Sequence, residues 1–400
     1  MEKILREQGL KGNSYRLLFG DAKETAMMYD DSYSRPIGIK DDIAPRVIPF
    51  VSKTINTYGE NSFMWVGPRP LIFIMDAELM KVVMKNHTLF QKSFKISNPI
   101  FKKLIGGLIR FEGERWSNNR KKLNSAFHLD SLKGMVPIMQ QQCENILNEW
   151  KNMVPKDGHA LLDVFPYLVE YTGSVVSRSL FSVPFDETIK RTFNMISELT
   201  LIANQAQPFS YETTSNLVVW TIVMLAAHQE WQARAREEVS QFFSNEKTVN
   251  PRDLNHLKNL SMIINEVLRL YPPSIEVSRV VEKETSLGKY CLPKGTMVML
   301  PVIMLHRNPK VWGDDVLEFK PERFAEGALK AANGQAAFIP FGWGVRNCIG
   351  ANLGVWETKV FITLMLLNFS FELSPSYKHG PLVSLNMQPQ YGAPLILRRL

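Results

Sequence analysis

The stretch FGWGVRNCIG, from Phe341 to Gly350, places a cysteine in a glycine-punctuated loop directly before an amphipathic segment. Glycines let the backbone curl, so amide N–H groups can point at the sulfur of Cys348. The N-terminus of the following helix and the guanidinium of Arg346 add positive potential. Together these groups favour the thiolate, which is the form of cysteine that ligates a soft metal. The competing interpretation of any single cysteine is a buried, inert thiol.

The spacing Phe-x-x-Gly-x-Arg-x-Cys-x-Gly favours metal ligation, because five fixed positions match by chance in a chain of this length on the order of once in ten thousand. This spacing is the signature of the cytochrome P-450 family of haem-thiolate monooxygenases, which the chain resembles. The resemblance implies that Cys348 is the axial ligand of the iron in haem b. It also implies that Phe341, Arg346 and Gly350 belong to the loop that binds the haem.

Two further charged motifs occur in the order that the family shows. Glu266 and Arg269 lie three positions apart, on one face of a predicted helix that Pro272 and Pro273 end. By resemblance this pair joins Arg323 in a buried Glu-Arg-Arg lock. The alternative is an exposed helical pair, which stabilises a helix by roughly 0.2–0.5 kcal/mol.

The resemblance implies four side chains at the haem propionates, the first two of them in a Trp-x-x-x-Arg motif similar to one in the family. Trp116 and Arg120 are four positions apart, so an indole N–H and a guanidinium share one helical face and can hold carboxylates. The resemblance adds Arg279 and Arg346 to this set. The alternative for the basic segment 115–122 is a solvated helix face, which also suits the family's proximal surface, where an acidic reductase docks.

Glu212 and Thr213 resemble the acid–alcohol pair of the family's long distal helix. A hydroxyl over the open iron position can hydrogen-bond dioxygen and relay protons, which the neighbouring carboxylate helps to supply. The alternative is a threonine that only caps a helix. The family has a small residue and a glycine before this pair, whereas this chain has the bulky sequence Phe209-Ser210-Tyr211.

Spacing indicates that a segment of the family pattern is missing. Trp116 and Thr213 are only 97 positions apart, whereas the 82 positions from Glu266 to Cys348 are normal for the family. We therefore expect a deletion seam near residues 208–211, with the loss of part of the distal and roof helices. The N-terminal anchor helix is expected to be missing as well.

The most specific likeness is to plant microsomal members of the secologanin synthase-like group, and it covers the chain apart from the seam. It implies a lipophilic substrate of terpenoid, iridoid or steroid-like type, with Ile275 and Val277 facing the pocket. One oxygen atom of O2 enters the substrate, with electrons from NADPH delivered by NADPH–cytochrome P-450 reductase. Two alternatives remain: a haem-thiolate isomerase or lyase, and a truncated, catalytically impaired haem-binding remnant.

Composition excludes several classes of protein. The chain has 400 residues, a net charge of +8 and 45% apolar residues, so it is neither disordered nor, with interspersed charges, a nucleic-acid binder. Three distant cysteines do not form a disulfide framework. No apolar run reaches the roughly 18 residues of a membrane span. By resemblance the enzyme works at the cytosolic face of the endoplasmic reticulum, although a chain without an anchor could be soluble.

The predicted fold is mainly α with a minor β region, arranged as one domain over residues 1–400. Strands are predicted at Ser62–Val66 and Leu71–Ile74 around a Gly-Pro-Arg-Pro turn, between Val277 and Pro301, and in the tail. Helices are predicted at Ile43–Tyr58, Ala77–Lys85 (capped by Asp76), Glu114–Ser125, Leu132–Asn152, Val164–Leu180, Thr213–His228, Trp231–Ser244, Leu257–Leu270 and from Cys348 to about Leu367.

Overall fold

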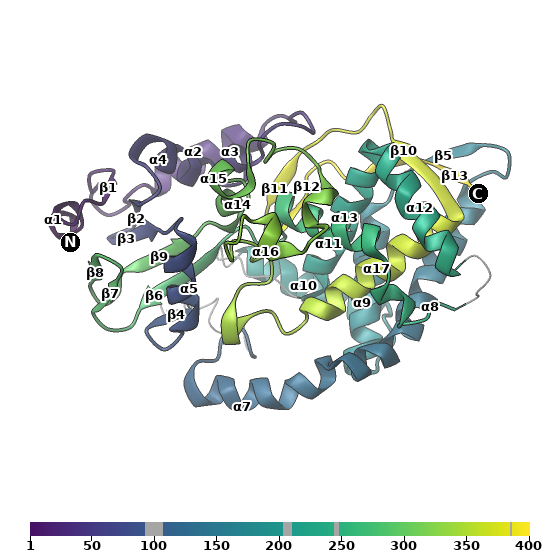
Figure 1. Ribbon diagram of the computed structural model, residues 1–400, viewed down its shortest axis with the longest axis horizontal. Helices are drawn as coiled ribbons and strands as arrows, with labels where there is room; N and C mark the ends of the chain where they lie inside the picture. The colour runs from purple at the N-terminus through teal and green to yellow at the C-terminus, as the bar shows by residue number, and fades with distance from the viewer. Residues whose placement is uncertain (93–106, 203–209, 244–247, 385) are drawn as a thin grey trace.

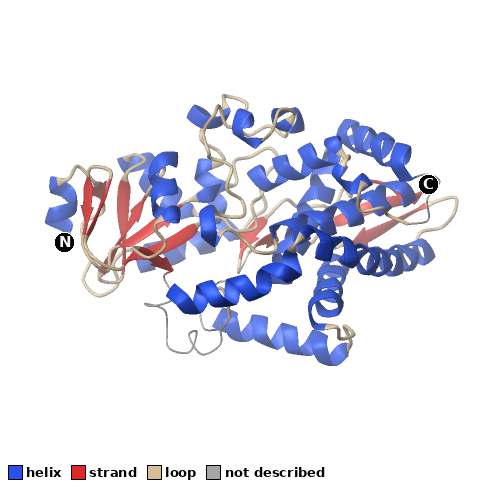
Figure 2. Ribbon diagram, turned by 60° about the horizontal axis from the view of Figure 1, so that its bottom comes forward, coloured by secondary structure: helices blue, strands red, loops and turns tan. Residues whose placement is uncertain are grey.

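The computed structural model describes residues 1–92, 107–202, 210–243, 248–384 and 386–400. Within these ranges the chain is mainly helical with a minor strand component, so the predicted fold class is confirmed. Figure 2 shows most strands gathered toward the N-terminal end of the molecule and the long helices toward the opposite end. Among the described residues, no helix combines the length and apolar character that a membrane span requires.

Eleven long helices build the larger part of the described structure (Figure 1). They are α2 (Ala22–Tyr33), α4 (Pro49–Tyr58), α5 (Ala77–Lys85), α7 (Gly113–Asn124), α8 (Leu129–Met153), α9 (Phe165–Phe181), α10 (Glu187–Ile202), α11 (Ser210–Ala227), α12 (Gln229–Phe243), α13 (Lys258–Leu270) and α17 (Ala351–Asn368). Five short helices are α1 (Glu2–Glu7), α3 (Ala44–Val47), α14 (Val302–Leu305), α15 (Pro309–Trp312) and α16 (Ala328–Ala331).

The helical core forms around the two helices that are apolar on every side. Residues 217–226 of α11 are all buried, and α17 buries residues on all its faces, as expected for central helices. Amphipathic helices α8, α9, α12 and α13 surround them, each with its apolar face inward. Helix α8, for example, buries Leu132, Met139 and Ile146 at seven-residue spacing.

A six-stranded sheet forms the second core. Its strand order is β1 (Lys11–Gly12), β2 (Ser62–Val66), β3 (Arg69–Phe73), β9 (Met297–Leu300), β6 (Val277–Val281) and β4 (Phe90–Lys92). Helix α5 packs on it, and Met262 and Phe338 contact both cores.

Smaller sheets complete the fold. They are β10 (Phe369–Leu373), β13 (Pro394–Arg399) and β5 (His159–Asp163) in one sheet, and the pairs β7 (Thr285–Leu287) with β8 (Tyr290–Leu292) and β11 (Pro381–Val383) with β12 (Met387–Pro389).

Two predicted elements differ most from the structure, whereas the other predicted helices shift by at most three residues at either end. The helix predicted over Ile43–Tyr58 is broken at Ile48, whose φ of −141° and ψ of 59° lie outside the helical region, which a following proline disfavours. The predicted four-residue turn between β2 and β3 is shorter, because Arg69 and Pro70 already pair with the neighbouring strand. Helices α2 and α10 were not predicted.

Candidate functional site

The Cys348 loop connects a short 3-10 turn (Gly344–Arg346) to α17, which begins three residues after the cysteine. Gly342 and Gly344 have φ angles of +76° and +69°, which side-chain-bearing residues rarely adopt. The curl brings the amide of Cys348 to 2.8 Å from the carbonyl oxygen of Phe341. The thiol is left exposed on one side of the loop.

The protonation of Cys348 departs from the sequence-based expectation. Cys348 is still accessible to solvent, but the protein atoms around it remove part of its hydration and so raise the pKa of the thiol; this effect outweighs the Gly350 amide and the charges of Arg120 and Lys92, which lower it. The Gly350 amide acts in the predicted direction, but the charges that lower the pKa belong to Arg120 and Lys92 and not to Arg346, and the net shift is opposite to the predicted one. A coordinating metal cation deprotonates a thiol outright, so a metal ion bound by Cys348 would convert the thiol to the thiolate.

Helix α7 brings basic side chains to the Cys348 loop. Arg120 donates to the backbone oxygen and to the side-chain oxygen of Asn347, at 2.8 and 3.0 Å. The guanidinium of Arg346 lies 3.8 Å from the ring centroid of Trp116 and pairs with Glu112. The structure thus brings together Trp116, Arg120 and Arg346, but Trp116 packs beneath a guanidinium.

Strands β4 and β6 add two more cations beside this group. Lys92 and Arg279 are paired across the strands. Burial and the neighbouring guanidiniums lower the pKa of Lys92 to about 8, and burial lowers that of Arg279 to about 10. Glu112 opposes these shifts and is also the ion-pair partner of Arg346.

Four buried or half-buried cations around one carboxylate form a site with surplus positive charge. We call Lys92, Arg120, Arg279 and Arg346 the cation cluster. Two propionates beside a thiolate-ligated iron would neutralise it, so this donor set fits haem b. Sequence reasoning missed Lys92 and Glu112, because only the pairing of β4 with β6 and the position of the start of α7 bring them here.

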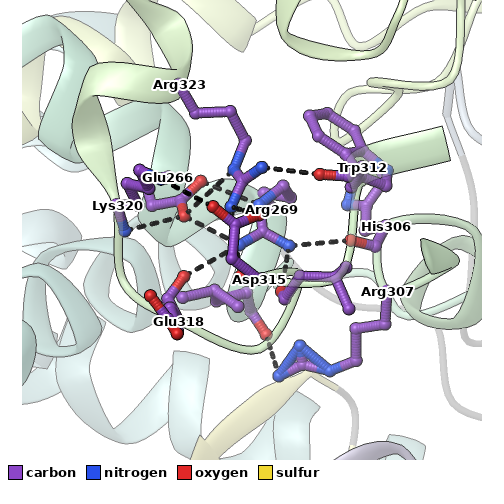
Figure 3. A network of polar contacts seen from close by, with 11 residues as sticks. Glu266, Arg269, His306, Arg307, Trp312, Asp315, Glu318, Lys320 and Arg323 are labelled. Atoms are coloured by element: carbon purple, nitrogen blue, oxygen red, sulfur yellow. Dashed lines mark hydrogen bonds and ion pairs between the residues drawn. The ribbon is translucent and has the colours of Figure 1, made fainter.

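The polar lock joins α13 to the segment after α15 (Figure 3). Arg269 and Glu266 are both fully buried and form two hydrogen bonds of 2.7 Å. Arg269 also donates to the backbone oxygens of His306, Val316 and Glu318, so one side chain fixes the segment after α15 to α13.

Arg323 is connected to this lock less directly than the resemblance implies. Its Nε lies 3.7 Å from Glu266 Oε1, which is beyond hydrogen-bond distance, whereas its Nη2 donates to Asp315 at 2.8 Å. Asp315 is therefore the nearer carboxylate partner of Arg323, and Figure 3 shows it between the two arginines.

Glu212 and Thr213 lie in the first turn of α11, both half-buried. The helix has 18 residues and begins at Ser210, three residues before Thr213. Residues 208 and 209 of the predicted seam lie outside the described residues. The next residue, Thr214, hydrogen-bonds Glu357 of α17, and burial raises the pKa of this carboxyl to about 8.

The two residues that the resemblance places at the substrate pocket lie in different hydrophobic cores. Ile275 packs into the helical core, and Val277 begins β6 and packs against the sheet core.

A sequence model of the cytochrome P-450 family matches residues 47–211 and 209–390 of the chain. The two matches meet at residues 209–211, close to the start of α11.

Characterised plant relatives match the whole chain. The 7-deoxyloganic acid hydroxylase of Catharanthus roseus is 38% identical, in an alignment that covers 100% of this chain and 94% of that protein. Secologanin synthase 1 of the same plant is 35% identical, with 100% and 93% covered. Echinocystic acid 23-monooxygenase of Saponaria officinalis is 35% identical, with 100% and 94% covered.

Proposed function

The chain belongs to the cytochrome P-450 family and is a haem-dependent monooxygenase, and from that premise we propose that it oxygenates a lipophilic terpenoid, iridoid or steroid-like molecule. The names of the relatives support this substrate class, since they include an iridoid-acid hydroxylase and an echinocystic acid monooxygenase. The electrons come from NADPH through NADPH–cytochrome P-450 reductase, for which the basic face of α7 is the docking surface. The place of action is the cytosolic face of the endoplasmic reticulum.

The observation that carries the proposal is the Cys348 loop surrounded by the cation cluster. Cys348 would provide the thiolate ligand of a haem bound here, and Trp116, Arg120, Arg279, Arg346 and Lys92 would hold its propionates. When bound, haem supplies the iron at which dioxygen is reduced and one oxygen atom is transferred to substrate.

Thr213 is proposed as the group that holds a proton on the distal side, with Glu212 as its source. A threonine hydroxyl can accept a proton on one lone pair while it donates its own, so it relays protons without changing charge. Ile275 and Val277 are the proposed residues of the substrate side, although they pack into different cores.

A second candidate is a haem-binding form with impaired turnover. The alignment with 7-deoxyloganic acid hydroxylase runs over 489 positions against 400 residues, so at least 89 positions fall opposite a gap in this chain. The meeting of the two family matches at residues 209–211 supports a seam there. A chain without this segment would bind haem but protect the iron poorly from water.

The haem site is tested by the spectrum of the reduced protein with carbon monoxide. We expect the strongly red-shifted Soret band of thiolate-ligated haem, and its loss in Cys348→Ser. Cys291→Ser is the matched control, because Cys291 is also an exposed free cysteine. Loss of the band in Cys291→Ser or Cys143→Ser would refute the ligand assignment.

The reaction is tested by adding reductase and NADPH to the haem-loaded protein. Substrate-dependent NADPH consumption with oxygenated product supports the monooxygenase. Substrate conversion without NADPH would indicate an isomerase or lyase, and NADPH consumption that yields only peroxide would indicate the impaired form.

A further inference from the structure

A chain of aromatic and imidazole side chains runs from α11 toward the protein surface. Trp220 stacks on Tyr271, with ring centroids 4.6 Å apart and planes 16° from parallel. The Tyr271 hydroxyl lies 3.2 Å from Nε2 of His379, whose Nδ1 lies 2.9 Å from the hydroxyl of Tyr377. We call Trp220, Tyr271, His379 and Tyr377 the aromatic chain. Its residues come from α11, the residue after α13 and the segment before β11, and the rings of Trp220, Tyr271 and His379 contact one another.

The hydrogen bonds of the aromatic chain have a direction. Burial and the charges of Arg46 and Arg307 lower the pKa of His379 to about 4, so the imidazole is neutral and has one donor and one acceptor nitrogen. Tyr271 is only 2% exposed, so its O–H must donate to a protein group, and Nε2 is the acceptor beside it. Nδ1–H then donates to the hydroxyl of Tyr377, which is a partly exposed residue.

The two ends of the aromatic chain lie in different surroundings. Trp220 is fully buried, seven residues after Thr213 on α11, which is about 10 Å along the helix axis. Tyr377 lies between the exposed residues Ser376 and Lys378. The chain therefore connects the distal helix with the surface through side chains in stacking or hydrogen-bond contact.

We propose that Tyr271 is a proton-coupled oxidation site, which removes oxidising equivalents from the haem side when no substrate consumes them. With hydrogen peroxide as the oxidant, each molecule takes up two electrons and two solvent protons and becomes two molecules of water. One electron comes from Tyr271 by way of Trp220, and the other comes from the haem. The O–H bond of Tyr271 breaks, its proton forms an N–H bond at Nε2 of His379, and a neutral tyrosyl radical remains.

The charges around His379 prevent weak oxidants from oxidising Tyr271. Arg46 and Arg307 repel the imidazolium that oxidation creates, and Asp41 only partly offsets them. An electron from an external reductant such as ascorbate, together with the proton from His379, restores Tyr271.

The test is electron paramagnetic resonance of haem-loaded protein frozen within seconds of mixing with hydrogen peroxide. We expect a tyrosyl radical in the unmodified chain, its loss in Tyr271→Phe, and its loss in His379→Gln, which keeps a polar side chain but cannot take up the proton. Tyr171→Phe is the matched control, because Tyr171 is also fully buried but donates to a backbone oxygen at 3.1 Å. Peroxide should also bleach the haem faster in Tyr271→Phe.

Equal radical yields and equal bleaching in Tyr271→Phe and Tyr171→Phe would overturn the proposal. It rests on haem binding, so the carbon monoxide spectrum of each variant is recorded first. If a variant lacks haem, the same comparison uses a photogenerated ruthenium(III) polypyridyl complex as the one-electron oxidant. A radical yield that does not depend on Tyr271 in that experiment also overturns the proposal, whatever the fate of the haem site.

Discussion

Glu357 is a carboxyl group that the fold holds away from water. It is 1% exposed on α17, nine residues after Cys348, and hydrogen-bonds Thr214. Because burial disfavours the charged form, the native protein keeps a proton here that the unfolded chain has already released at neutral pH.

Glu357→Gln should therefore change the pH dependence of stability. The native pKa of about 8 is above the ordinary value of 4.5, so the unfolding free energy of the unmodified protein falls as pH rises between these values. Glutamine can still accept from Thr214 and is neutral at every pH. In urea titrations the variant should match the unmodified protein near pH 5 and be more stable by roughly 2–4 kcal/mol at pH 9.

Glu372→Gln is the control for this comparison, since Glu372 lies at the surface in an ion pair with Arg398. A stability difference for Glu357→Gln that is the same at pH 5 and pH 9 would contradict a buried, protonated carboxyl.

Thr213→Ala should preserve haem binding but divert electrons from product to peroxide, because the distal proton relay is weakened. The measurement is the amount of product formed for each NADPH consumed. Thr221→Ala is the control on the same helix, because the Thr221 hydroxyl only donates to the Leu217 carbonyl oxygen at 2.7 Å. An unchanged ratio in Thr213→Ala would exclude Thr213 from the mechanism.

Elements with strong local signals were predicted closely from the sequence. Helix α5 has the predicted bounds, and the predicted cap is present, with Asp76 accepting from the Leu79 amide at 2.8 Å. Helix α13 starts one residue after the predicted position and ends at Leu270 as predicted. Helix α10 and strand β5 were missed, and β5 is defined by its pairing with β13, more than 200 positions away in the chain, which no local pattern reveals.

Substitutions of Glu266 and of Arg323 in the lock between α13 and the segment after α15 should reduce haem retention to different extents. Glu266→Ala leaves Arg269 buried without its carboxylate, which costs roughly 3–5 kcal/mol and should abolish haem retention. Arg323→Ala should be milder, because Asp315 keeps Lys320 as an ion-pair partner at 2.8 Å. Haem content and thermal midpoint are the measurements.

Glu322→Ala serves as the control, because Glu322 makes an exposed ion pair with Arg234. Normal haem content in Glu266→Ala would mean that the lock does not support the haem site. Equal losses of haem in Glu266→Ala and Arg323→Ala would mean that the contact between Arg323 Nε and Glu266 Oε1 stabilises the lock more than its distance of 3.7 Å suggests.

At the scale of the whole molecule, the sequence predicted site residues that belong to contiguous motifs, such as those around Cys348, Glu266 and Trp116. Members that come together only through tertiary packing were missed. Glu112 pairs with Arg346 across more than 200 positions, and Lys92 reaches the cluster only because β4 pairs with β6. The residue types of Glu112 and Lys92 and their spacing in the sequence do not indicate a role in the site, because single charged residues are common on any protein surface.

The gap relative to the relatives leads to a prediction about the whole enzyme. Inserting the corresponding segment of 7-deoxyloganic acid hydroxylase between Ser210 and Tyr211 should increase product formed per NADPH, because a closed distal side excludes water. An insertion of equal length made of a flexible Gly-Ser linker is the control. Efficient coupled oxidation by the chain of 45.8 kDa, verified by intact mass, would contradict this prediction.

The cation cluster also has a consequence for the protein before it acquires its prosthetic group. Lys92 and Arg279 are half-buried beside Arg120 and Arg346, so the apoprotein offers an electrostatic binding site for small multivalent anions. Inorganic phosphate or citrate in a buffer should occupy this site and compete with the incoming porphyrin. Reconstitution with hemin should therefore be slower in phosphate than in a chloride buffer of the same pH and ionic strength, and the choice of buffer becomes part of preparing an active enzyme.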